Sequence, residues 1–222
     1  MKHIFRKITE IIHNTLLLLK YGGIVVCVKQ LLRFIYSTET QLGFALDLQE
    51  ITPSSIEARI PYDLRLATDK DMDEVLQKAE TEDKQSAQKL IFRNWLYKDG
   101  YRNCYVARSV DTGELGFIQT VIHPEENRNV GGTFRSWFPE LKEDEILLEG
   151  AYTFEKYRGN RLHPAVLSDI LRIYKEKGYN RMIAHIDKNN SSAIKGAERV
   201  GFKVFQEVPG RKILFFTQRK FS

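Results

Sequence analysis

From about residue 60 onward, apolar residues recur in two alternating patterns, and this feature most constrains the fold. Short runs of period two, typical of strands, are interleaved with longer runs of helical period. The expected order is βααβββαβαββ, which is typical of an α/β domain whose central sheet carries helices on both faces. The expected strands are residues 60–67, 101–108, 114–122, 146–153, 182–186, 202–208 and 212–217, and the expected helices are residues 69–80, 83–97, 164–177 and 191–200.

Residues that start or stop elements support these boundaries. Thr68 is expected to cap the first helix, and residues 110–113 form a hairpin signal between two strands. Pro164 suits the first position of a helix, where a missing N–H leaves no bond unmade. Residues 209–210, Pro-Gly, are predicted to form the turn between the last two strands.

The first 36 residues carry the whole net charge of the chain. The formal charge is +5, from 34 Lys and Arg against 29 Asp and Glu. Six of the basic residues and one of the acidic residues lie in residues 1–36, so the remainder is neutral. A neutral main domain argues against nucleic-acid binding, which usually requires a basic face.

Residues 4–19 place apolar side chains near helical spacing, and a second apolar stretch follows at residues 24–36. Lys20 and the pair Gly22-Gly23 interrupt the apolar run, which argues against a secretory signal and against a membrane-spanning helix. Two interpretations stay open. In one, the helices pack on the main domain or on another copy of the chain, which would make a homo-oligomer. In the other, they hold a cytoplasmic protein at the anionic inner face of a membrane.

Residues 37–57 contain polar runs and a proline and are interpreted as a linker. The chain is therefore divided into a basic amphipathic helical segment with its linker, residues 1–50, and a main domain, residues 51–222. Two cysteines, Cys27 and Cys104, lie far apart in apolar settings, without a histidine at metal-ligand spacing. We interpret them as buried thiols in a reducing, cytoplasmic compartment, and no metal site is predicted.

The segment 157–164 joins an expected strand to an expected helix. A turn at this junction presents several backbone N–H groups along one helix axis, which suits a phosphate or a pyrophosphate. Gly159 allows a ligand to approach the backbone closely. Such a turn is structural more often than functional, so it has to be interpreted together with the rest of the C-terminal half.

Residues 153–163, Thr-Phe-Glu-Lys-Tyr-Arg-Gly-Asn-Arg-Leu-His, resemble the pyrophosphate-binding motif of the GNAT superfamily of acetyl-CoA-dependent N-acetyltransferases. In that motif, Arg/Gln-x-x-Gly-x-Gly/Ala stands between a strand and a helix. Residues 190–194, Asn-Ser-Ser-Ala-Ile, and the following Val-Gly-Phe at 200–202 resemble the second motif of the family. The resemblance covers residues 60–218 and implies a GNAT-like mixed central sheet with helices on both faces.

The resemblance implies an acyltransferase that uses acetyl-CoA, or another acyl-CoA, and transfers the acetyl group to an amine of a small or sugar-like acceptor. The alternative is a non-catalytic GNAT-like protein that binds ligands or lies at the membrane surface. The backbone of Tyr152 and Thr153 would bind the pantetheine arm, and Asn190 would contact the pantetheine or the adenine. The pyrophosphate would be held by the amides of Arg158, Gly159, Asn160, Arg161, Leu162 and His163.

Three positions depart from the family's pattern. Arg161 stands where the family usually has glycine, and a positive φ there would cost an arginine about 1–2 kcal/mol. His163 stands where the family has glycine or alanine. Ala197 occupies the position at which many members carry a tyrosine that protonates the leaving thiolate, so this chain would use another donor, a water, or no acid at all. Tyr152 and His163 are the candidates for that acid.

Four further side chains are candidates for the chemistry or for the acceptor site. Glu149, on the strand before the turn, is the candidate general base; the alternative is a surface glutamate at a strand edge. His123 ranks below it, and His185 is expected to be a satisfied histidine of the core. Trp137 and Phe138, in a long polar segment, either line the acceptor site or fix the loop.

Overall fold

The computed structural model describes residues 20, 36–51, 56–128, 137–213, 216–219 and 221. These residues form an eight-stranded sheet with the strand order β2-β3-β4-β5-β6-β1-β7-β8. The strands are β1 (Tyr36–Asp47), β2 (Tyr62–Leu66), β3 (Cys104–Ser109), β4 (Leu115–Ile122), β5 (Glu145–Thr153), β6 (Arg181–Asp187), β7 (Lys203–Ile213) and β8 (Phe216–Arg219). The helices are α2 (Asp69–Lys78), α3 (Lys84–Lys98), α4 (Leu162–Glu176) and α5 (Ser191–Val200), with short 3-10 helices at Pro124–Arg128 and Glu155–Tyr157.

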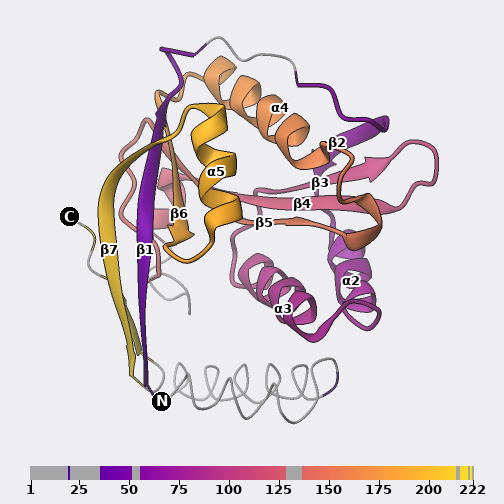
Figure 1. Cartoon of the computed structure of the whole chain (residues 1–222), viewed down its shortest axis with the longest axis horizontal. Helices are drawn as coiled ribbons and strands as arrows, with labels where there is room; N and C mark the ends of the chain where they lie inside the picture. The colour runs from indigo at the N-terminus through magenta and orange to yellow at the C-terminus, as the bar shows by residue number, and fades with distance from the viewer. Residues whose placement is uncertain are drawn as a thin grey trace.

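The helices cover both faces of this sheet (Figure 1). Helices α4 and α5 lie on one face, and α2 and α3 lie on the other. Strands β5 and β6 run parallel, whereas the other described neighbours in the sheet are antiparallel. The architecture is the mixed α/β sheet with helices on both faces that the sequence predicts.

Strand β1 is the largest departure from the sequence-based prediction. The sequence assigns most of these residues to a linker, but β1 lies between β6 and β7 and pairs with both. Phe44 and Leu46 of β1 point into the core and are 0% and 4% exposed. The linker prediction is wrong over this strand. The sheet thus includes residues of the segment 1–50, which the sequence places outside the domain.

The final strands also differ from the prediction. Pro209 and Gly210 do not form a turn, because β7 runs through both of them opposite Thr40 and Glu39 of β1. The ladder between β7 and β8 covers Gly210 to Ile213 and stops short of Pro209. In the described residues, Pro209 therefore has a partner strand on one side only, where a proline without an N–H is tolerated.

Capping side chains explain why several helices match their predicted limits. Thr68 caps α2 in a capping box with Asp71, and the carboxylate of Asp71 also accepts from Arg65 and Arg108. Burial by itself would raise the pKa of Asp71, but hydrogen bonds from Arg65, Thr68 and Arg108 hold it well below its usual range. Helix α5 occupies the predicted residues 191–200, with Gly201 as its C-cap.

The predictions for the amphipathic helices at residues 4–36 lie outside the described residues, except at Lys20 and Tyr36. Within the described part of the chain, no helix has the length and the apolar character needed to cross a bilayer.

Candidate active site

The parallel strands β5 and β6 stop pairing part-way along their length. Their ladder ends at Leu148 and Ala184, yet β5 continues to Thr153 and β6 to Asp187. Figure 1 shows the two strands turning away from each other. Beyond Leu148, β5 therefore has no partner strand on its β6 side, although side chains of Gln119, Arg93 and Arg158 donate to several of its carbonyl oxygens. A strand edge without a partner strand suits an extended ligand that carries amide groups of its own.

A bulge in β5 marks the point at which the strands separate. Gly150 has a positive φ of 67°, and the register between β4 and β5 shifts at the same place. The guanidinium of Arg93, from α3, donates to the carbonyl oxygens of Gly150 and Ala151, the latter at 2.8 Å. Burial lowers the pKa of Arg93 to about 10, so the group is still a cation at neutral pH. A buried cation thus holds the strand in shape where its ladder with β6 ends.

Helix α4 begins at Leu162, two residues before the predicted start, so Pro164 is its third residue. Its N-cap is Arg161, which has φ 58° and offers no side-chain cap. Arg161 is the only described residue other than glycine with a positive φ, so the strained conformation considered from the sequence is present. In the described structure, the amides of residues 159–163 have no hydrogen-bond partner. This uncapped start, with its helix dipole, is suited to a doubly negative group.

A family model described as the acetyltransferase (GNAT) family matches residues 70–202, which is more than half of the chain. The chain belongs to the GNAT family. Members of this family use acetyl-CoA or another acyl-CoA. A comparison with curated proteins by sequence finds no match.

Solved structures agree with this fold. A GCN5-related N-acetyltransferase from Sphaerobacter thermophilus has a TM-score of 0.54 at 14% identity, over 87% of this chain and 57% of its own. A glucosamine N-acetyltransferase region in a fungal multi-domain GH3 β-N-acetylglucosaminidase has a TM-score of 0.56 at 12% identity, over 82% of this chain and 22% of its own. A Drosophila protein has a TM-score of 0.52 at 14% identity, over 85% of this chain and 55% of its own. The chain thus spans little more than half of these structures, or less, and the likeness shows the fold alone.

The GNAT-type turn after β5 brings together the residues predicted to hold a pyrophosphate. Arg158, Gly159, Arg161 and His163 are exposed, and Asn160 is half-buried. Leu162 is 2% exposed because its side chain enters the core, so only its amide is available to a ligand. That these groups bind a pyrophosphate stays a prediction.

The two candidate acids lie in different settings. The Tyr152 hydroxyl donates to Glu82 Oε2 at 2.7 Å and accepts from Arg158 at 3.3 Å. Burial, with a contribution from Glu82, raises the pKa of Tyr152 to about 12, so the phenol keeps its proton at neutral pH. The ring of His163 stacks on Phe117, with centroids 5.4 Å apart. Tyr152 is thus held in place by hydrogen bonds and His163 by ring stacking.

Glu149, the candidate base, lies one residue before the bulge, on the face of the sheet that α3 covers. It is half-buried, and burial raises the pKa of its carboxyl, an effect that Arg219 and Arg93 oppose. The backbone oxygen of Glu149 accepts from Gln119 Nε2 at 2.9 Å, which fixes this part of β5. A carboxyl with a raised pKa is better suited to accept a proton than an ordinary surface glutamate.

The structure does not bring His123 to this site. Its Nε2 lies 2.6 Å from the hydroxyl of Tyr174, towards the C-terminal end of α4, whereas the uncapped turn is at the other end. Ala197 packs against the core in α5. Asn190 is the N-cap of α5, and its side chain accepts from the amide of Ala193 at 3.2 Å. Its predicted contact with the pantetheine or the adenine stays a prediction.

His185 contradicts the expectation of a satisfied core histidine. It is half-buried in β6, and its Nε2 is a buried atom without a hydrogen-bond partner in the described structure. Phe138 is 5% exposed and packs edge-on against Tyr101, so it fixes the loop. Trp137 stacks on Phe92 of α3, with centroids 5.7 Å apart.

Sequence reasoning missed two arginines at the site. Arg93 lies in α3 among polar and apolar neighbours, and no sequence pattern distinguishes it from a surface arginine. Arg219 of β8 donates to Glu39 Oε1 from two nitrogens, at 3.0 and 2.5 Å, and to the carbonyl oxygen of Trp137 at 2.7 Å. The signal for Arg219 in the sequence is its position in an otherwise strand-like C-terminal segment.

Proposed function

We propose that this chain is an acyl-CoA-dependent N-acyltransferase that acetylates an amine of a small or sugar-like acceptor. The observation that carries the proposal is that the open backbone of β5 beyond Leu148 leads directly into the uncapped start of α4. The open strand edge suits the extended amides of pantetheine, and the uncapped helix suits a pyrophosphate. The two features lie in the order in which these groups occur in acyl-CoA.

Specific groups of the chain would hold such a molecule. The backbone of Tyr152 and Thr153 would bind the pantetheine arm, and the amides of residues 159–163 would bind the pyrophosphate. The exposed side chains of Arg158 and Arg161 add positive charge beside those amides. When bound, acyl-CoA supplies the acyl group in an activated form, as a thioester.

The chain's own groups would then orient the acceptor and move protons. Glu149 would take the proton of the acceptor amine as the nitrogen bonds to the acyl carbon and the carbon–sulfur bond breaks. The leaving thiolate would receive a proton from Tyr152, whose hydroxyl is positioned by Glu82 and Arg158. Since a thiol has a pKa of about 8.5, well below that of Tyr152, the thiolate could also leave near neutral pH with only a hydrogen bond from this hydroxyl.

Glucosamine is the first acceptor to test. The fungal structure that shares this fold is a glucosamine N-acetyltransferase region, and the family acts on small molecules. At 12% identity this similarity motivates the choice of substrate and nothing more.

A matched pair of glycine variants tests the cofactor site. Gly159 and Gly178 lie at opposite ends of α4, have φ values of 79° and 87°, and have open space where a Cβ would be. Replacing either by valine should therefore cost a similar amount of stability, about 1–2 kcal/mol. We expect Gly159→Val to reduce acetyl-CoA affinity at least tenfold in calorimetry, whereas Gly178→Val should leave it within twofold.

The wild-type protein should bind acetyl-CoA with a Kd in the micromolar range, about −8 kcal/mol. Equal loss of affinity in both variants, or in neither, would show that the turn at Gly159 is not the binding site. Binding without turnover of any amine would favour the non-catalytic alternative.

A further inference from the structure

Three neighbouring strands each bring one polar side chain to the same place on the α3 side of the sheet. Leu147 and Ile183 both pack in the apolar cluster under α3, so Glu149 and His185, two residues further along β5 and β6, face the same way. Gly43 of β1 lies opposite His185, and Gln41, two residues before it, shares that face. Glu149, His185 and Gln41 thus form a row that crosses β5, β6 and β1 where β5 and β6 separate.

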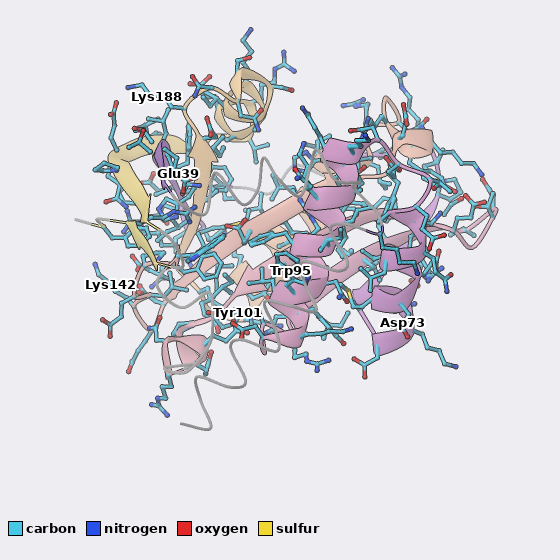
Figure 2. The ribbon with its side chains drawn as sticks, turned by 90° about the horizontal axis from the view of Figure 1, so that it is seen from below. Glu39, Asp73, Trp95, Tyr101, Lys142 and Lys188 are labelled. Atoms are coloured by element: carbon cyan, nitrogen blue, oxygen red, sulfur yellow. The ribbon has the colours of Figure 1, made fainter. Side chains whose placement is uncertain are left out.

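This row contains buried polar atoms that the described chain leaves unpaired. Gln41 Oε1 and His185 Nε2 are buried and have no hydrogen-bond partner among the described residues. Trp95 Nε1, on the α3 helix that covers this face, is also buried and has no hydrogen-bond partner among the described residues. Figure 2 looks onto this side of the molecule and labels Trp95 and, further across the sheet, Glu39. Since unpaired buried polar groups are costly and rare, their concentration on one face indicates a ligand that pairs them.

The charges on this face limit what that ligand is. All three nitrogens of the Arg219 guanidinium are engaged, two by Glu39 and one by the carbonyl of Trp137. Arg219 is therefore already paired with a carboxylate, and three of its five N–H donors are in use. Burial, together with Arg219, lowers the pKa of His185 to about 4, so its imidazole is neutral and one ring nitrogen accepts a hydrogen bond.

The row therefore presents acceptors rather than cations. Gln41 Oε1, one nitrogen of His185 and the carboxylate of Glu149 accept hydrogen bonds, and Trp95 Nε1 donates one. The stacked rings of Phe92 and Trp137 add an apolar wall on the same side. This combination matches a molecule with several N–H and O–H donors and apolar C–H faces.

We propose that Gln41, His185 and Trp95 form the acceptor site beside Glu149, and that it takes a hydroxylated primary amine without a carboxylate, such as an amino sugar. This inference rests on the proposed transferase function and assigns its substrate class. It also gives β1, from the N-terminal segment, a part in substrate selection.

A three-member acceptor panel tests the substrate class. Glucosamine carries an amine and hydroxyls, glucosaminic acid adds a carboxylate, and cyclohexylamine lacks hydroxyls. With acetyl-CoA as donor, we expect kcat/KM for glucosamine to exceed that for each of the others at least tenfold. Preference for glucosaminic acid or for cyclohexylamine, or turnover and binding of none of the three, would overturn the assignment.

Isosteric apolar variants test the residues. Gln41→Leu and His185→Phe should raise KM for glucosamine at least tenfold, with kcat changed less than threefold. Because each removes an unpaired buried atom, the thermal midpoint without acceptor should stay the same or rise. Gln77→Leu, at an exposed position of α2, is the matched control and should leave KM unchanged.

Acetyl-CoA affinity, measured by calorimetry on the same proteins, separates the two proposals. If the wild type fails to bind acetyl-CoA, the proposed function itself is wrong. If acetyl-CoA binds normally while Gln41→Leu and His185→Phe leave KM unchanged, only the acceptor site is wrong.

Discussion

Replacing Arg93 by methionine should weaken acyl-CoA binding as well as the fold. The change removes three charged hydrogen bonds, two to Gly150 and Ala151 of β5 and one to the carbonyl oxygen of Lys89, worth about 1.5–3 kcal/mol each. It also removes a buried cation whose pKa of about 10, against 12.5, corresponds to an opposing cost of about 3 kcal/mol. The three bonds outweigh this cost, so the net loss of stability is about 1.5–6 kcal/mol. That loss lowers the thermal midpoint by about 3–24 °C, at 2–4 °C per kcal/mol.

Acyl-CoA binding should weaken for a separate reason. The bulge at Gly150 sets the direction of the open part of β5, and without Arg93 the strand is free to straighten or to re-pair with β6. We expect Arg93→Met to raise the Kd for acetyl-CoA at least tenfold in calorimetry at 25 °C. Lys89→Met, on an exposed side chain one helical turn earlier, is the control and should change the Kd less than twofold. An Arg93→Met protein with a wild-type Kd would show that the guanidinium does not maintain the site.

Three further outcomes are expected. Glu149→Gln should lower kcat by about 10²-fold. Because only the deprotonated carboxylate can accept a proton, the wild-type kcat should rise with pH through the raised pKa of Glu149. This pH dependence should be absent in the variant. A Glu149→Gln enzyme with unchanged kcat and pH profile would remove Glu149 from the mechanism. Ala197→Tyr should raise kcat less than threefold, and a larger gain would show that the missing tyrosine limits turnover. If residues 1–35 are a membrane anchor, the full chain should sediment with anionic liposomes, and high salt should release part of it. A chain starting at Tyr36 should stay in solution and keep its acetyl-CoA affinity. An insoluble truncated chain would instead show that those residues complete the fold.

The parts of the fold that the sequence predicts are those with strong local signals. Helix α5 is bounded by Asn190, which caps it, and by Gly201, which ends it in a left-handed conformation. Helix α2 has the capping box at Thr68. The family motifs at 153–163 and 190–202 identify the turn and the GNAT fold, because backbone geometry there depends on a few residues close in sequence.

The sequence-based predictions that are wrong concern features that tertiary contacts determine. The polar start of β1 looks like a loop, yet its backbone pairs with β7 from Tyr36 onward and with β6 from Gln41 onward. At Pro209, local turn chemistry is overruled by pairing with β1 along the whole of β7. At His185, the apolar strand predicts burial, but it does not show whether the buried ring nitrogen has a hydrogen-bond partner.

The position of β1 has a consequence for how the chain assembles. Gln41 pairs with Asp187, 146 positions later, and Leu42 pairs with Glu207. Strand β1 is therefore made before both of its neighbours and must wait until β6 and β7 have emerged before it can pair with them. Pairings between such distant residues slow folding, because the loop between them must close first. Until then β6 and β7 expose unpaired edges, which invite pairing with other chains. The C-terminal half of the sheet is thus the part of this protein most dependent on protection while it is being made.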